Sequence, residues 1–349
     1  MPNDPIPSFI ATSSDSTVPL NDPECNRRYR AIDVTDPDPF FPGERKIDAT
    51  CRVDRPHVPA LDRILGHAFP VLDHGFLRCV DYMGDDAAVV QAARTSYARG
   101  TKTAQKDAGL IRYLMRHWHT TPFEMCEIKL HVKLPIFVAR QWIRHRTASV
   151  NEMSARYSIL DGEFYIPAPE HLAAQSSVNN QGRGAVLGEK EAAAVLDILR
   201  DDALRAYGSY EEMLRDDDEA GKLGLARELA RMNLPTNIYT QWYWKTDLHN
   251  LFHFLRLRAD SHAQYEIRAY AEVICDIAQV WVPHSYAAFA DYRLNAVQFS
   301  AQEMAALREI ILPACPNGIL GAVAKKHLIE KGGSQREADE FLAKLHVQS

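Results

Sequence analysis

The chain has 349 residues, and its shares of hydrophobic residues (46%) and charged residues (25%) are ordinary for a globular protein of one large domain or two modest ones. A net charge of -6 argues against a protein that coats nucleic acid, so any anion-binding site must be a local basic cluster. There is no apolar run near the roughly 20 residues that span a bilayer, and the polar first residues do not resemble a signal peptide.

Three regions are expected along the chain. Residues 1–65 contain many prolines and little periodicity, so we predict an N-terminal extension that is disordered or loosely packed. Residues 66–295 carry the regular hydrophobic patterns and are expected to form the catalytic domain. Residues 296–349 are expected to form a C-terminal helical extension of two short helices, with Gly332-Gly333 between them.

The first half of the catalytic domain mixes strands and helices. Residues 71–76 are typical of a turn, and residues 77–83 of a strand that follows it. Asp85 and Asp107 are each placed to cap a helix. The second of these helices should bury one face, and residues 126–133 alternate between apolar and polar side chains, which predicts a half-buried strand. The buried face of the helix is expected to consist of Leu110, Ile111, Leu114, Met115 and Trp118.

The second half is expected to be mainly helical. Pro135 suits the first turn of a short helix, and residues 171–189 are polar enough for a surface loop. A long amphipathic helix should follow over residues 196–214, with further helices at about 221–232, 247–258 and 263–282. These patterns predict an α+β fold, in which a small antiparallel sheet is flanked by many helices.

A dense basic cluster follows the helix after Pro135. Arg140, Arg144, Arg146 and Arg156 lie among Gln, Asn, Glu and Ser side chains. An arginine side chain binds phosphate through two parallel hydrogen bonds and stays charged at any working pH, so the cluster predicts a phosphorylated ligand. The alternatives are a solvated helix end with surface arginines, or a nucleic-acid-binding surface, which the acidic net charge and the absence of interleaved aromatic residues disfavour.

A second polar concentration spans residues 257–268. Arg258, His262 and Glu266 would share one face if this helix were continuous. A metal site is a weak interpretation, because a cation would be repelled by Arg258 and no second pair of ligands is present, so we expect no metal. An ordinary helix surface is the alternative.

The six cysteines are scattered without a CxxC pair, which favours reduced thiols in a cytoplasmic protein over a disulfide framework. A catalytic thiolate needs a nearby cation or base. Cys126 is expected to face the core from a strand and Cys275 to lie in a helix, and none of the candidates, Cys79 beside Arg78 included, stands out as an activated thiol, so no cysteine nucleophile is expected.

The basic cluster resembles the signature of flavin-dependent thymidylate synthases. Arg144-His145-Arg146 is followed by seven residues and Ser154, and residues 151–156 fit the family's Asn-Glu-x-Ser-x-Arg pattern. Residues 119–124 resemble its His-x-Ser/Thr-Pro-Phe-Glu segment, and residues 257–264 resemble its late helix. The resemblance covers about residues 70–290, in the right order, and implies the thymidylate synthase-complementing fold.

The resemblance also implies a reaction. In this family dUMP is methylated to dTMP, with 5,10-methylenetetrahydrofolate as the carbon donor, FAD as the hydride carrier and NADPH as the reductant of the flavin. It further implies a homotetramer whose active sites are shared between subunits. A nucleotide- or flavin-binding regulator without catalysis is the alternative, and a nucleic-acid-binding module is a distant third.

Residue by residue, the resemblance assigns Arg258 to catalysis, by polarising the uracil ring. Where several relatives carry Asn in the flavin-contacting helix, this chain has Asp247 and His253. The expected flavin-binding residues are His119, Thr121, Arg144, His145, Arg146, Glu152, Asp247, His249 and His253. The expected dUMP-binding residues are Gln141, Trp142, Ile143, Arg144, Glu152, Met153, Ser154, Ala155, Arg156, Arg231 and Arg258.

Overall fold

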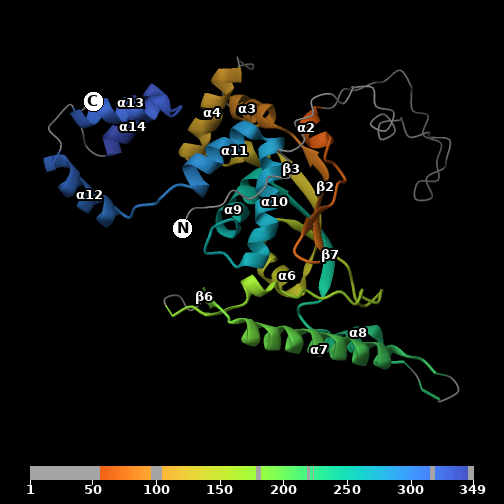
Figure 1. Cartoon of the computed structure of the whole chain (residues 1–349). Coiled ribbons are helices and arrows are strands. Elements are labelled where there is room, and N and C mark those ends of the chain that lie inside the picture. The colour runs from red at the N-terminus through yellow and green to blue at the C-terminus, as the bar shows by residue number, and fades with distance from the viewer. Residues whose placement is uncertain are drawn as a thin grey trace, which may run out of the picture.

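The structure is a computed structural model that describes residues 56–95, 104–177, 182–217, 221–222, 224–314 and 319–344. Its centre is a five-stranded antiparallel sheet in the order β1-β2-β3-β7-β4, with helices packed against it (Figure 1). The strands of this sheet are β1 (Phe69–Val71), β2 (Gly75–Met83), β3 (Glu127–Pro135), β4 (Ser149–Glu152) and β7 (Tyr239–Asp247). The expected α+β fold with a small antiparallel sheet is confirmed.

The helices before the long amphipathic helix are α2 (Pro59–Asp62), α3 (Asp86–Thr95), α4 (Ala104–Arg116), α5 (Thr121–Glu124), α6 (Ile136–Trp142) and the short turn η1 (Pro169–His171). The long helix is α7 (Glu189–Leu214), followed by α8 (Arg227–Ala230), η2 (Arg231–Asn233), α9 (Leu248–Arg258) and α10 (Tyr265–Trp281). The chain continues with α11 (Pro283–Phe289), η3 (Ala290–Leu294), α12 (Ala301–Ala314), α13 (Ile319–Glu330) and α14 (Gln335–Lys344). None of the helices in these ranges is long and apolar enough to cross a membrane.

The expected alternation of strand β3 is present. Ile128, Leu130 and Val132 are fully buried, while the residues between them are only partly covered. This strand pairs with β2 on one side and with β7 on the other. Strand β3 therefore lies in the middle of the sheet, and its apolar side faces the main core.

Strand β7 was not predicted. Thr240, Trp242, Trp244 and Thr246 are buried at every second position, which is the period of a strand. The prediction at about 247–258 placed a helix directly after this segment, and that helix is present as α9. The aromatic and β-branched residues of 239–246 are the signal that identifies the strand.

Of the two predicted helix caps, one is confirmed and one is wrong. The backbone N–H of Ala88 donates to Asp85 Oδ1 at 2.9 Å, so Asp85 caps helix α3 as expected. Asp107 does not cap α4, because the helix begins three residues earlier and the Asp107 carboxylate forms an ion pair with Arg94. Trp118 is also not on the buried face: it follows the end of α4 and its side chain is 58% exposed.

Four further expectations need correction. The stretch 171–189 contains a two-stranded sheet of β5 (Ala173–Gln175) and β6 (Arg183–Val186) and is more than a loop. Of the helix expected at 221–232, only α8 and η2 form. The C-terminal region has three helices where two were expected, and Gly332-Gly333 lies between α13 and α14. Pro135 is the residue before α6 and not within its first turn.

Helix α9 ends at Arg258 and α10 begins at Tyr265, so the continuous helix considered for residues 258–266 does not exist. Arg258, His262 and Glu266 are therefore not on one helical face. The Glu266 carboxylate is buried and accepts two hydrogen bonds from Arg183, at 2.6 and 2.7 Å. Among the described residues no cluster of side chains could hold a metal ion.

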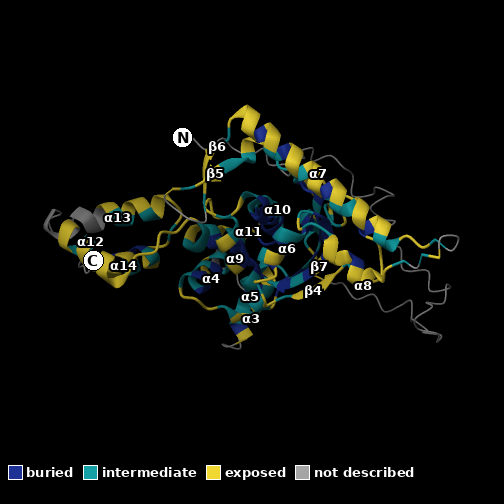
Figure 2. Ribbon diagram, turned by 90° about the horizontal axis from the view of Figure 1, so that it is seen from below, coloured by how far each residue is buried: buried dark blue, intermediate teal, exposed yellow. Residues whose placement is uncertain are grey.

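The two ends of the described chain pack on the central domain. Most of the expected extension 1–65 lies outside the described residues, but Leu61 of α2 is fully buried in the main core. At the other end, Glu337 of α14 binds Arg116 of α4 at 2.9 Å. Figure 2 shows that α7 and the C-terminal helices are largely exposed, whereas α10 lies in the buried interior.

Candidate active site

The signature segment connects helix α6 to strand β4. Trp142 ends α6, residues 143–148 form the turn, and β4 pairs with β7 so that Glu152 lies opposite Trp242. The side chains of Arg144 and Arg146 are exposed, and neither forms an ion pair within the described residues. The fold thus presents two free guanidinium groups on a turn that is fixed at both ends by regular structure.

His145 of this turn contacts Arg258 at the end of α9. The Nε–H of Arg258 donates to His145 Nε2 at 3.0 Å, which requires a neutral imidazole with its proton on Nδ1. Burial, followed by the positive charges of Arg258 and His253, lowers the pKa of His145 to about 4. His145 is therefore neutral at physiological pH and holds the Arg258 side chain in place.

Five of the predicted dUMP-binding residues line one cavity of about 340 Å³, and three of them carry polar side chains. Glu152 enters it from β4, Ser154 from the segment after β4, and Arg231 from η2. The hydroxyl of Thr240 donates to Glu152 Oε1 at 2.9 Å and so orients the carboxylate. An arginine, a carboxylate and a hydroxyl in a cavity of this size suit a phosphorylated sugar.

The other predicted dUMP-binding residues are placed in different ways. Met153 and Ala155 line the same cavity. Arg156 is exposed and lies 3.5 Å from Glu228. The Oε1 atom of Gln141 is buried and has no hydrogen-bond partner among the described residues, which costs free energy.

Trp142 and Ile143 differ in exposure. The Trp142 indole is fully buried and stacks on Phe254 with ring centroids 4.6 Å apart, so its side chain belongs to the main core. Only the backbone of Trp142 is available for a substrate contact. Ile143 is 37% exposed at the start of the turn.

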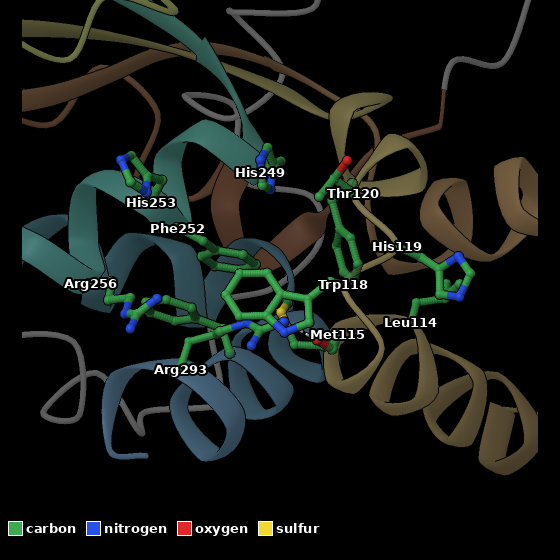
Figure 3. Close-up of a pocket in the computed structure, with 12 residues that line it drawn as sticks. Leu114, Met115, Trp118, His119, Thr120, His249, Phe252, His253, Arg256 and Arg293 are labelled. Carbon is green, nitrogen blue, oxygen red and sulfur yellow. Dashed lines mark hydrogen bonds between the residues drawn. The ribbon is translucent and has the colours of Figure 1, made fainter. Parts of the chain in front are cut away.

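A second, open pocket of about 60 Å³ lies between α4, α9 and η3 (Figure 3). His249 and His253 reach it from α9, and Trp118 and Arg293 lie across it (Figure 3). His119 is on its margin, and its ring stacks on Tyr113, with the centroids 5.9 Å apart. The pocket therefore brings together three of the predicted flavin-binding residues.

Asp247 and Thr121 are at helix starts. The Asp247 carboxylate accepts from the backbone N–H of Asn250 at 2.9 Å and from its side chain at 2.7 Å, so it caps α9. Thr121 is exposed at the first position of α5. In the described chain no single cavity contains all the predicted residues. Part of the dUMP set lines one hollow and part of the flavin set lines another, and Arg258 lines neither.

The described cysteines are unsuited to nucleophilic catalysis. Cys79, Cys126 and Cys275 are buried, and burial raises the pKa of each thiol to about 12. Each thiol is therefore protonated at neutral pH. The remaining cysteines are outside the described residues.

The sequence patterns did not identify Thr240, Arg256 or Arg293. Thr240 orients Glu152 from strand β7, and recognising that strand from its period of two would have brought it to attention. Arg256 is two residues before Arg258 on α9, and Arg293 belongs to η3. Neither arginine stands out in the sequence, because only folding brings them into the same pocket.

Comparisons with known proteins show the family. The family described as "Thymidylate synthase complementing protein" matches residues 78–284. A flavin-dependent thymidylate synthase of Ruegeria pomeroyi is 70% identical over 253 residues, which cover 72% of this chain and 83% of the relative. The corresponding protein of Gluconobacter oxydans is 65% identical over 254 residues, 73% of this chain and 82% of the relative.

A solved structure shares the fold. It is the UMP/dUMP methylase PolB of Streptomyces cacaoi bound with 5-Br dUMP, with a TM-score of 0.57 and 31% sequence identity. The match covers 65% of this chain and 99% of that protein. The signature turn, the cavity beside it and these relatives lead to one conclusion: the chain belongs to the flavin-dependent thymidylate synthase family, the thymidylate synthase complementing proteins.

Proposed function

We propose that this enzyme methylates dUMP to dTMP with 5,10-methylenetetrahydrofolate as the carbon donor, FAD as the hydride carrier and NADPH as the reductant. The observation that carries the proposal is the 340 Å³ cavity that unites Glu152, Ser154 and Arg231. We further propose a cytoplasmic homotetramer in which Arg156 completes the dUMP site of a neighbouring subunit.

The cavity supplies what a nucleoside monophosphate needs. The guanidinium of Arg231 carries the charge for the phosphate, and the Ser154 hydroxyl can donate to a phosphate or sugar oxygen. Glu152, held by Thr240, accepts from a sugar hydroxyl or a ring N–H.

Arg258 is assigned the electrostatic role. One N–H of its guanidinium is used by His145, and the remaining donors form no hydrogen bond within the described residues. Burial lowers the pKa of Arg258 below its ordinary value, but an arginine stays charged at neutral pH. A fixed positive charge stabilises negative charge that develops on the uracil ring without reorganising.

The side chains at the second pocket suit contacts with a flavin whose ring system would lie outside this small hollow. Imidazole groups of His249 and His253 can donate to or accept from the polar edge of a flavin ring. Arg144 and Arg146, which are exposed on the signature turn, could hold its phosphates. When bound, the flavin supplies the hydride. The protein's part is to bind and orient the ligands and to keep His145 neutral, while bond-making belongs to the flavin and the folate.

The proposal is tested by reconstituting the purified protein with FAD, dUMP, methylenetetrahydrofolate and NADPH. We expect dTMP to form and NADPH to be oxidised in step, and the gene should complement a thymidine auxotroph. A yellow protein that binds dUMP but forms no dTMP would support the regulator instead. A protein that cannot be loaded with flavin would contradict the proposal.

A further inference from the structure

Two arginines without acidic partners share the pocket beside α9. Arg256 and Arg293 both line it, and neither forms an ion pair among the described residues. Arg256 donates one hydrogen bond, to Gln298 at 3.2 Å, and Arg293 donates one, to the carbonyl of Met115 at 2.5 Å. Each guanidinium has five N–H donors, so most of the donors of this pair are unused.

Arg256 and Arg293 lie close together although both are positively charged. Partial burial, followed by repulsion from Arg256, lowers the pKa of Arg293 to about 10, which leaves it charged at neutral pH. Burying unpaired charge costs free energy that an anion between the two guanidinium groups would recover. An anion that accepts hydrogen bonds from both guanidinium groups would therefore be stabilised here.

An aromatic surface adjoins the two arginines. The Arg293 guanidinium lies over the Trp118 indole, 3.1 Å from the ring centroid, and Figure 3 shows the two side chains against each other. Trp118 is 58% exposed, and its φ of 60° is a left-handed conformation that a bulky residue adopts at a cost. A fixed, exposed indole beside two arginines suits a ligand that carries both a flat ring and a negative charge.

The size of the pocket limits what enters it. About 60 Å³ holds a few water-sized groups, which is enough for one phosphate and too little for a ring system. A ring attached to that phosphate would therefore lie outside, against Trp118.

From these observations we infer that Arg256 and Arg293 bind a phosphate group of a nucleotide ligand, whose ring packs on Trp118. The inference rests on the proposed function for its choice of ligand, since both the NADPH reductant and FAD carry phosphates and an adenine ring. None of the residues assigned by resemblance accounts for the reductant.

Binding is measured on the FAD-loaded enzyme with 2′-phospho-ADP-ribose, a fragment that carries the phosphates and adenine of the reductant but no nicotinamide. Trp118 is a direct reporter, because the other four tryptophans are at most 2% exposed. We expect quenching of its fluorescence, and loss of that signal in Trp118→Phe. Calorimetry gives the affinity independently of any activity.

Arg256→Gln and Arg293→Gln should each weaken binding about tenfold or more, because each removes charge-assisted hydrogen bonds. Arg256→Gln is the safer variant, since Arg293 also holds the end of α4 through Met115. Arg200→Gln is the matched control: it removes an equal charge from the exposed surface of α7 and should bind like the wild type.

Two binding experiments distinguish whether the phosphate belongs to the reductant or to the flavin. If the reductant supplies it, the FAD-loaded enzyme binds 2′-phospho-ADP-ribose and the variants lose this binding. If the flavin supplies it, the loaded enzyme does not bind the fragment, and flavin-free Arg256→Gln loses its preference for FAD over riboflavin. Wild-type affinity of both folded variants for both ligands would overturn the inference.

Failure of this inference is distinguishable from failure of the proposed function. With saturating FAD reduced chemically by dithionite, the reductant is not needed, so the wild type should form dTMP in a single turnover whether or not the phosphate site exists. Absence of dTMP from the wild type in this assay would contradict the proposed function. Unchanged binding by the variants would contradict only the phosphate site.

Discussion

The Nε–H of Arg258 donates a hydrogen bond to His145 Nε2 at 3.0 Å, which joins two segments that are 113 residues apart in the chain. One is the signature turn after α6 and the other is the end of α9. This bond fixes the direction of the guanidinium that we propose polarises the uracil ring. It also couples the protonation state of a histidine to the position of that charge.

Replacing Arg258 tests its catalytic role. We expect Arg258→Ala to lower the rate of dTMP formation at least about a hundredfold, since loss of one positioned electrostatic contact to a transition state costs about 3 kcal/mol. Flavin should stay largely bound, as measured by its absorbance. Arg258→Lys should not restore the rate, because lysine lacks the rigid fork. Near-normal turnover of Arg258→Ala would remove this residue from the mechanism, and Arg200→Ala on the exposed face of α7 serves as the control.

The low pKa of His145 predicts an acid-dependent loss of stability. Its folded pKa of about 4 is below the ordinary value of 6.5, so the unfolded chain binds the proton more readily. The contribution of neutral His145 to the free energy of unfolding is complete above about pH 6.5 and is lost as the pH falls toward 4. The difference in unfolding free energy between the wild type and His145→Gln should therefore shrink over this range in denaturant titrations. A difference that is constant with pH would show that His145 titrates normally.

The buried thiols predict that the described cysteines are dispensable for the reaction. Cys79→Ala, Cys126→Ala and Cys275→Ala should each retain dTMP formation, with a loss of about 1 kcal/mol of stability from the small cavity. In the native wild type, iodoacetamide should leave these three thiols unmodified, as read by mass spectrometry of peptides. Abolished turnover in a folded variant would point to a nucleophilic cysteine.

The buried position of Trp142 predicts that replacing its indole lowers the free energy of unfolding. Its indole is surrounded by Trp242, Trp244 and Phe254 and is fully buried, so Trp142→Ala should lower the unfolding free energy by about 3–5 kcal/mol. Trp142→Phe should cost less, because it keeps a ring and removes an Nε1–H that has no partner in the described part of the chain. Urea titrations followed by circular dichroism measure both variants. If Trp142→Ala unfolds like the wild type and only dUMP binding weakens, the side chain contacts substrate and not the core.

The ion pairs of Glu337 predict that this residue attaches helix α14 to helix α4. Its carboxylate is about 10% exposed, and it binds both Arg112 and Arg116 of α4 and the hydroxyl of Tyr292. Glu337→Gln leaves two guanidinium groups partly buried without this partner, so docking of α14 should weaken by about 3 kcal/mol. Hydrogen exchange should speed up in α14 but not in β3. Glu330→Gln, which removes an exposed carboxylate from α13, is the control. Equal protection of α14 in both variants would show that the ion pairs do not hold it.

The sequence by itself determined the family, the α+β class and the local elements with strong patterns. Strand β3 follows from its period of two, and the cap of α3 follows from Asp85, because both depend on neighbours in sequence. The signature from Arg144 to Ser154 is likewise local. Strand β7 was missed although its pattern is visible, and Asp107 was placed at a cap although the helix begins before it.

Only the tertiary structure decided which side chains meet. Arg258 reaches His145, Thr240 orients Glu152, and Arg256 joins Arg293, all across long separations in sequence. It also decided that the Trp142 side chain is in the core although the residue is in the signature region. The physical reason is that burial and the pairing of charges depend on the packing of whole elements, which a local pattern does not contain.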